Sequence, residues 1–223
     1  IKPEQFPFAT YVLEDALTLN QDVNLTIEPG VIIKFGKQYE DYIFNGLLKA
    51  EGTASEPIIF TSIKDDEYGG DTNNDGTTTK PSNQDWESIF IKTSASSLKY
   101  CVFRYGGYYT NQYAAVMING SNPLIENCTF FQNDKSIFST NGAAPTIRNC
   151  TFRENTKAPV SIALSSNPIF ENNNFINNKI NGLGIVPGTY TGPANYTLKK
   201  IKPEQFPFAT YVLEDALTLN QDV

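Results

Sequence analysis

The sequence predicts an all-β fold, a parallel β-solenoid in which each regular coil has about 22–23 residues. Short segments recur with that period, and they consist of β-branched and aromatic runs broken by Asn and Gly. No stretch has the apolar spacing of a long amphipathic helix. Three short strands with their turns fit a period of this length, so each repeat is interpreted as one coil.

The repeat is clearest in the second half of the chain. Residues 123–133 read PLIENCTFFQN, residues 145–155 read PTIRNCTFREN and residues 168–178 read PIFENNNFINN, and an earlier copy, LKYCVFRY, lies at 98–105. Equivalent residues of stacked coils lie about 4.8 Å apart, so each column of this alignment predicts a ladder. The ladder residues are Asn127, Asn149 and Asn172; Phe130, Phe152 and Phe175; Asn133, Asn155 and Asn178; and Cys101, Cys128 and Cys150.

Each column has its own physical interpretation. The Phe column predicts an aromatic stack inside the solenoid. The Asn columns predict amide ladders at tight corners, where Asn also tolerates the left-handed backbone. The three Cys precede the stacked Phe by two residues, so they point inward as small hydrophobes and no disulfide is expected. Glu126, Arg148 and Glu171 form an outward column of alternating charge.

The first third of the chain shows the same organisation with longer loops. Residues 17–36 alternate apolar and polar residues around a Pro-Gly turn, and residues 46–62 place a Gly-to-Pro turn between two strands. Residues 86–94, WESIFIKTS, predict one more strand before the coil at 98–105.

These segments carry a family resemblance. NLTIEPGVIIKF, GLLKAEGTASEPIIFTS, GGDTNNDGTTTKPSNQDWESIFI and LKYCVFRYGG in succession resemble the right-handed parallel β-helix domains of large bacterial and archaeal surface proteins. The later coils look like the pectin-lyase-like β-helix repeat of the same proteins. The resemblance covers residues 11–185 and implies a right-handed coil. It implies little about function, because that fold hosts lyases, hydrolases, adhesins and inert stalks.

A longer repeat links the two ends of the sequence. Residues 1–23 and residues 201–223 both read IKPEQFPFATYVLEDALTLNQDV. We interpret the chain as one unit of 200 residues followed by the start of the next unit of a tandem array, with an engineered duplication as the alternative. The predicted parts are a linker at 1–10, a β-helix at 11–185, a Pro/Gly-rich linker at 186–210 and the next unit's first strand at 211–223. The predicted joint consists of Tyr11, Val12, Leu13, Tyr211, Val212 and Leu213.

Composition excludes several classes of function. The formal net charge is −7, and removing the −3 of the duplicated segment leaves −4 for one unit. An acidic unit disfavours a nucleic-acid or anionic-membrane partner. No apolar run approaches the roughly 20 residues of a membrane span. The chain has no His, which excludes His-based catalytic triads and His metal sites.

An acidic loop at 65–80, DDEYGGDTNNDGTTTK, is a candidate calcium site. Asp71, Asn73, Asp75 and Gly76 match the first half of the D-x-[DN]-x-[DN]-G loop, and Thr77 is placed to offer its carbonyl. Ser82 stands where the bidentate Glu of an EF-hand would be, so Asp65, Asp66 or Asp85 would have to complete the shell. A solvated acidic loop without a metal is the alternative.

The tyrosine loop at 105–113, YGGYYTNQY, is the second conspicuous insertion. Tyr105, Tyr108, Tyr109 and Tyr113 have the chemistry to stack on sugar rings or to contact a neighbouring molecule. The alternative, equally weighted here, is that they fold back over the coil.

No catalytic residues are predicted. The carboxylates of the regular coils are Glu126, Asp134, Glu154 and Glu171, and only Glu126 and Glu171 share a column, with Arg148 between them. No adjacent acid pair is apparent for acid–base work. The sequence therefore predicts a structural repeat of an extracellular filament or cell-surface stalk, assembled head to tail with itself. A glycan-binding adhesin is the alternative, and a polysaccharide lyase or hydrolase is a weaker one.

Overall fold

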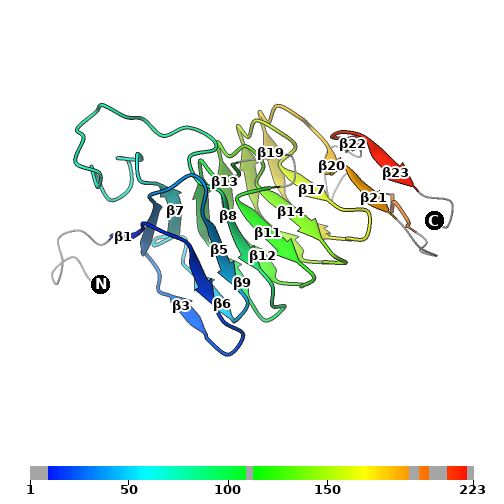
Figure 1. Ribbon diagram of the computed structural model, residues 1–223, viewed down its shortest axis with the longest axis horizontal. Coiled ribbons are helices and arrows are strands. Elements are labelled where there is room, and N and C mark those ends of the chain that lie inside the picture. Colours follow the sequence, from blue (N-terminus) through cyan, green and yellow to red (C-terminus); the bar gives the residue numbers. More distant parts are fainter. Residues whose placement is uncertain (1–9, 109–112, 191–195, 201–209, 220–223) are drawn as a thin grey trace.

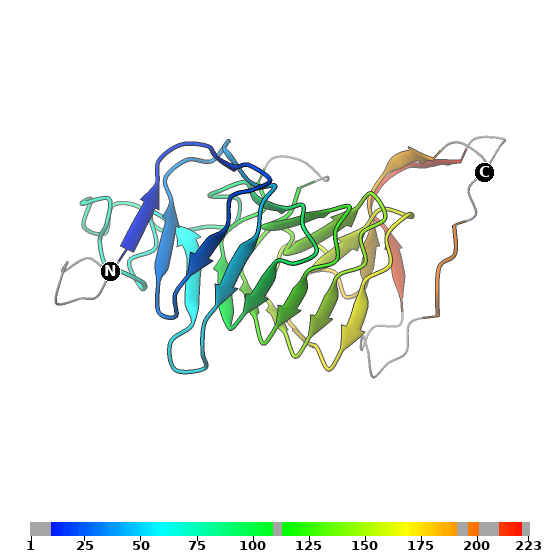
Figure 2. The same cartoon turned by 90° about the horizontal axis from the view of Figure 1, so that it is seen from below.

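The structure, a computed structural model, describes residues 10–108, 113–190, 196–200 and 210–219. These residues form a right-handed parallel β-solenoid of about eight coils, without a helix. Successive strands of each coil belong to different sheets, and each strand pairs in parallel with its equivalent one coil away. Figure 1 shows the coils stacked along one axis, and Figure 2 shows the same stack from below. The predicted fold class is confirmed.

Three long sheets run along the solenoid. The first sheet contains β1 (Thr10–Leu13), β4 (Ile32–Phe35), β7 (Ile58–Ser62), β10 (Cys101–Arg104), β13 (Thr129–Phe131), β16 (Thr151–Arg153) and β19 (Asn174–Ile176). The second sheet contains β2 (Leu17–Leu19), β5 (Asp41–Phe44), β8 (Ser88–Ile91), β11 (Val116–Asn119), β14 (Ile137–Thr140), β17 (Val160–Ile162), β20 (Leu183–Ile185) and β22 (Tyr211–Leu213). The third sheet contains β3 (Leu25–Ile27), β6 (Leu48–Glu51), β9 (Ser97–Lys99), β12 (Leu124–Glu126), β15 (Thr146–Arg148) and β18 (Ile169–Glu171). A separate pair is formed by β21 (Gly188–Tyr190) and β23 (Leu217–Leu219).

The core is a column of like side chains in the middle of the solenoid. Phe103, Phe130 and Phe152 are fully buried, and their rings stack nearly parallel. Ring centroids along the column are 4.7–5.0 Å apart, from Phe60 through to Phe175. That spacing matches the separation of paired strands, so the backbone ladder imposes the stack.

The three cysteines form a second inward column. All three are buried and free. The thiol of Cys128 donates to the carbonyl of Leu98, and that of Cys101 donates to the carbonyl of Ala50. Burial raises the pKa of the Cys128 thiol well above its usual range, which keeps it protonated and unreactive.

The sequence predicted both left-handed corners and amide ladders for the Asn columns, and the structure shows these two roles in different columns. Asn127, Asn149 and Asn172 adopt left-handed backbone, with φ of 54°, 53° and 52°, at one corner of successive coils. The side-chain amide ladder lies in the other column, that of Asn133, Asn155 and Asn178. There the Asn155 amide donates to Asn178 Oδ1 at 2.7 Å, and the Asn133 amide donates to Asn155 Oδ1 at 3.3 Å.

Candidate assembly site

The repeated segment forms strands in both copies, but equivalent strands of the two copies join different sheets. In the first copy, β1 begins the first sheet beside β4, and β2 begins the second sheet beside β5. In the second copy, β22 ends the second sheet beside β20, and β23 pairs with β21. Both contacts are parallel. The two copies lie at opposite ends of the stack (Figure 1).

The second copy extends the backbone ladder of the last coil. Leu183 pairs with Tyr211 and Ile185 pairs with Leu213. The Leu183 N–H donates to the Thr210 carbonyl at 2.9 Å, and the Glu214 N–H donates to the Ile185 carbonyl at 3.0 Å. Since an uncovered sheet edge invites strand addition, the second copy covers the edge of β20. β21 lies within residues 186–210, which the sequence analysis described as a linker.

Two glycines shape the outer face of β20. Gly182 and Gly184 alternate with the inward Leu183, so they occupy outward positions. A Cβ on Gly182 would collide with the Val212 side chain, and a Cβ on Gly184 would collide with the Glu214 carboxylate. The glycines are therefore needed for close approach of the second copy rather than for a special backbone angle.

The Glu214 carboxylate folds back across Gly184 and ends in a buried polar contact. Its Oε2 lies 2.6 Å from Lys135 Nζ, and its Oε1 accepts a 2.5 Å hydrogen bond from the Ser161 hydroxyl. The side chains of Lys135 and Glu214 are 0% and 6% exposed. Burial lowers the pKa of the Lys135 ammonium, and the charge of Glu214 opposes that effect. Without Glu214, a buried cation would lose its anionic partner.

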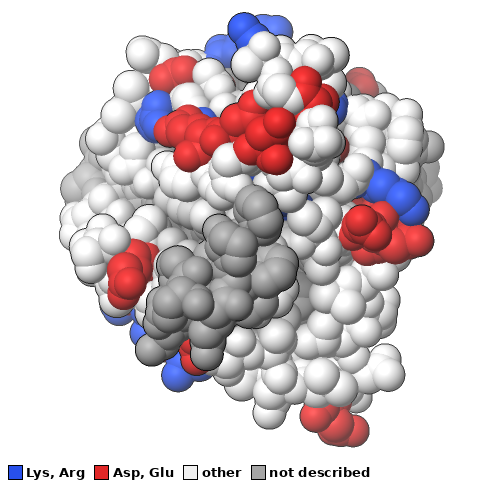
Figure 3. Space-filling view, turned by 90° about the vertical axis from the view of Figure 1, so that its left-hand side faces the viewer, with Lys and Arg blue, Asp and Glu red and all other residues white. Residues whose placement is uncertain are grey.

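Among the described residues, the opposite end of the solenoid presents an apolar cavity. A cavity of about 520 Å³ there is lined by the inward side chains of the first coils. Tyr11 and Leu13 belong to that lining, and Tyr11 is 44% exposed. Figure 3, which looks along the stack from this end, shows acidic side chains gathered on the same face. Exposed Lys199 and Lys200 lie near the other end, beside Tyr211.

The acidic loop is held to the solenoid by buried cations. Lys34, which is 0% exposed, donates to the Gly70 carbonyl at 2.6 Å. Burial lowers the pKa of the Lys34 ammonium, and the charges of Asp65 and neighbouring carboxylates raise it. Arg104 lies 2.6 Å from Glu67 and 3.4 Å from Asp65. Arg104 was not expected to reach the acidic loop from its place in the sequence, and the structure corrects that expectation. The role of Lys34 was not predicted either, although it is the charged residue of an otherwise apolar VIIKF strand.

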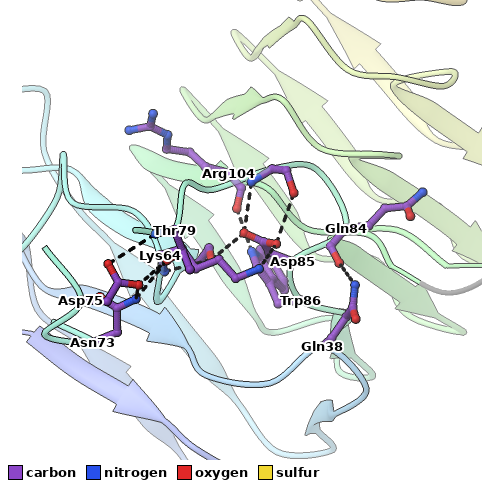
Figure 4. A network of polar contacts seen from close by, with 11 residues as sticks. Gln38, Lys64, Asn73, Asp75, Thr79, Gln84, Asp85, Trp86 and Arg104 are labelled. Carbon is purple, nitrogen blue, oxygen red and sulfur yellow. Dashed lines mark hydrogen bonds and ion pairs between the residues drawn. The ribbon is translucent and has the colours of Figure 1, made fainter. Parts of the chain in front are cut away.

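The predicted calcium ligands lie in one hydrogen-bonded turn. Asp71 accepts hydrogen bonds from the backbone N–H groups of Asp75 and Gly76 at 3.0 and 2.9 Å. Asp75 Oδ2 accepts from the Asn73 amide and from the Thr79 hydroxyl (Figure 4). Thr77 lies in the same exposed turn.

The residues expected to complete a calcium shell are engaged elsewhere. Asp85 lies 2.8 Å from Lys64, and Asp65 accepts a 2.6 Å hydrogen bond from Thr61 (Figure 4 shows the Asp85 contact). Asp66 remains exposed. Among the described residues, no group of three or more His, Cys, Asp and Glu is arranged to hold a metal ion. Carboxylate oxygens have further lone pairs, so calcium at this turn stays a prediction.

Comparison with protein families agrees with the architecture. Residues 73–199 match the model of the right-handed beta helix region, and residues 7–111 match the pectate-lyase-like beta helix domain. The chain belongs to the right-handed β-helix family. No curated protein and no solved structure matched the chain. Within the described residues, no helix is long and apolar enough to cross a membrane.

The tyrosine loop of this β-helix protein contacts its own coils at three of four predicted positions. Tyr105 is buried, and its hydroxyl accepts a 2.8 Å hydrogen bond from Arg104. Tyr108 packs edge-on against Tyr39, with 4.9 Å between ring centroids. Tyr113 packs in the same way on Phe90 at 5.9 Å. Tyr109 lies outside the described residues. These contacts correspond to the folded-back alternative for Tyr105, Tyr108 and Tyr113.

The β-helix also brings together a carboxyl pair that the sequence analysis missed. Asp41 pairs in register with Ser88, which places Asp41 next to Glu87 at the start of β8. Burial, the charge of Asp41 and a hydrogen bond to Asp41 raise the pKa of Glu87 to about 7. Burial also raises the pKa of Asp41. The two groups therefore titrate as a pair that shares a proton. Only the strand register reveals this pair, because Asp41 and Glu87 lie outside the recognisable repeats.

The remaining predicted charges are paired on the outer surface. Arg148 Nε lies 2.7 Å from Glu126 Oε1, and the register continues from Arg148 to Glu171. The pectate-lyase-like description names a family that includes enzymes. It carries no assignment of catalysis to this chain.

Proposed function

We propose that this β-helix protein is a structural unit of an extracellular filament or cell-surface stalk, in which units join head to tail through the repeated segment. One observation carries the proposal. The second copy docks on the last coil through a strand ladder and a buried ion pair between Lys135 and Glu214. A segment that starts a unit thus also fits the end of one.

The two ends of the unit have complementary properties. The beginning is apolar and acidic, whereas Lys199 and Lys200 add positive charge near the end. A head-to-tail contact that does not close into a ring generates an open filament. Backbone ladders along three sheets and the central Phe stack favour a stiff rod, which suits a stalk that carries load outside the cell.

Electron microscopy of the native protein tests the proposal. Eight coils spaced by about 4.8 Å make a unit of roughly 40 Å, so rods whose length grows in steps of that size are expected. Dispersed particles of one unit, at all protein concentrations and ionic strengths, would contradict a filament or stalk. Imaging whole cells with antibodies raised against the chain tests the extracellular location, because only surface protein is labelled on intact cells.

A further inference from the structure

We propose, on the basis of the proposed function, that one strand of the repeated segment is shared between two neighbouring units. This strand would rotate each unit about the solenoid axis by one of its three faces relative to the unit before it. The last strand of one unit, β22, would be the first strand, β1, of the next. It pairs with β20 on one edge and with the next unit's β4 on the other. The partner is a second copy of this unit.

The two copies of the strand form their backbone hydrogen bonds along opposite edges. In the second copy, the Thr210 carbonyl and the Glu214 N–H bond to β20. In the first copy, the Leu13 carbonyl accepts a 2.9 Å hydrogen bond from Gly36, which follows β4. Amide groups of alternate residues point to opposite edges of a strand, and residue 13 is odd where 210 and 214 are even. Both sets of bonds are therefore compatible in a single strand.

The side chains agree with the shared strand. The same residues point inward in both copies, since Tyr11 pairs with Ile33 and Tyr211 pairs with Leu183. Among the described residues, β1 and β22 each pair with a strand on one edge only. Tyr11 is 44% exposed and Leu213 is 61% exposed. A strand covered on both sides would bury these apolar groups and bring the Ile185 and Phe35 columns into line.

The next strand of the repeat also has a different neighbour in each copy. In the first copy, the Leu19 carbonyl at the end of β2 accepts a 3.0 Å hydrogen bond from Asn45, which follows β5. In the second copy, the equivalent strand β23 pairs with β21 through Leu217 and Gly188. The sheet that β21 begins would therefore continue through β23 into the next unit's β5.

The pairing fixes how successive units are rotated. β22 ends the second sheet, whereas β1, the equivalent strand of the first copy, begins the first sheet. β21 follows β20 along the coil, and its partner β23 is the twin of β2, which begins the second sheet. The first sheet of the next unit would therefore continue the second sheet of this unit, and the second sheet of the next unit would continue the strand that follows it along the coil, β21. Each unit is thus rotated by one of the three faces, and every third unit returns to the starting orientation.

Cryo-electron microscopy of a longer chain tests the inference. Residues 24–223 are appended twice to the full chain, which gives three units, and the acidic loops at 65–80 serve as markers because they project from the solenoid (Figure 1). We expect one unbroken rod with its three acidic loops on three different faces. A straight rod with all loops on one face would overturn the shared strand and leave the head-to-tail function intact. Units joined by a flexible hinge would overturn both.

Amide exchange gives a second readout that does not depend on imaging. Segmental ¹⁵N labelling of residues 201–223 distinguishes the second copy from the first. In the 223-residue chain, the Glu214 amide should be protected and the Leu213 amide should exchange rapidly. With one appended unit, protection of the Leu213 amide should rise on the order of 100-fold. An unchanged rate at Leu213, with Glu214 still protected, would mean that the next unit does not use this edge.

Discussion

Glu14 and Glu214 occupy the same position in identical 23-residue segments and lie in opposite surroundings. Glu14 is exposed at the beginning of the solenoid. The Glu214 side chain is 6% exposed and lies 2.6 Å from the ammonium of Lys135. The local sequence is the same, so the surroundings make the difference: Lys34 of β4 donates to the Gly70 carbonyl of the acidic loop, while β20 brings Glu214 over Gly184 to Lys135.

This pair supplies a matched test of docking. Replacing Glu214 with Gln removes the charge that compensates buried Lys135, and the loss of one partner of a buried pair costs about 3 kcal/mol. We expect E214Q to lower the melting temperature and to expose residues 210–219 to proteases. The identical change at Glu14, E14Q, should leave both properties unaltered. Equal effects of the two substitutions would show that the second copy is not docked as described.

A second prediction concerns the close approach at Gly184. A Cβ at this position would meet the Glu214 carboxylate and the Ser161 hydroxyl, so G184A should displace the second copy. Shortening the opposing side chain with E214A should relieve part of that collision. We therefore expect the double variant to be less destabilised in urea than the sum of the single changes, by about 1 kcal/mol. Additive costs would mean that the two positions are not in contact.

The Asp41–Glu87 pair predicts a dependence of stability on pH. The pKa of Glu87 is raised to about 7 from an ordinary 4.5, so the folded state holds its proton more tightly than the unfolded state. This contribution is fully present below about pH 4.5 and is lost as the pH rises to about 7.

Glu87→Gln isolates the contribution. At pH 8 the variant should be more stable than the wild type, by on the order of 2 kcal/mol, and at pH 5 the difference should shrink. Urea denaturation at the two pH values measures it. The control is E56Q, which removes an exposed carboxylate, and it should leave the pH profile as in the wild type. A parallel offset of E87Q at both pH values would contradict the shared proton.

Calcium binding by the acidic loop is tested by measuring the melting temperature. If Asp71 and Asp75 hold the ion with their remaining lone pairs, millimolar calcium should raise the melting temperature, and chelation should reverse the rise. D71N should abolish the response, whereas D215N, which changes an exposed carboxylate in the second copy, should preserve it. A melting temperature that is the same with calcium and with chelator would contradict calcium binding by this loop.

Repetition made the fold predictable. The Phe and Cys columns occur at a fixed spacing, and stacking in register follows directly from a constant coil length. The ring spacing of 4.9 Å between Phe130 and Phe152 is the structural form of that sequence period.

Contacts between unlike residues far apart in the sequence were not predictable in this way. Lys135 and Glu214 are separated by 79 residues and belong to no shared column. Lys34 lies beneath a loop that begins some thirty residues later, and Asp41 meets Glu87 across a long insertion. These contacts depend on the path of the insertions, which no repeat constrains. The joint at Tyr211, Val212 and Leu213 was predicted from the repeat, and the ion pair between Lys135 and Glu214 was not.

The buried ammonium of Lys135 makes neighbouring units dependent on each other for stability. A unit without the following segment would lack Glu214, whose carboxylate lies 2.6 Å from Lys135 Nζ, so it would be weaker than every unit that has a successor. In an array joined as proposed, each segment would stabilise the unit before it, and unfolding would begin at the last unit. Damage would then shorten such a fibre from that end and leave its interior intact.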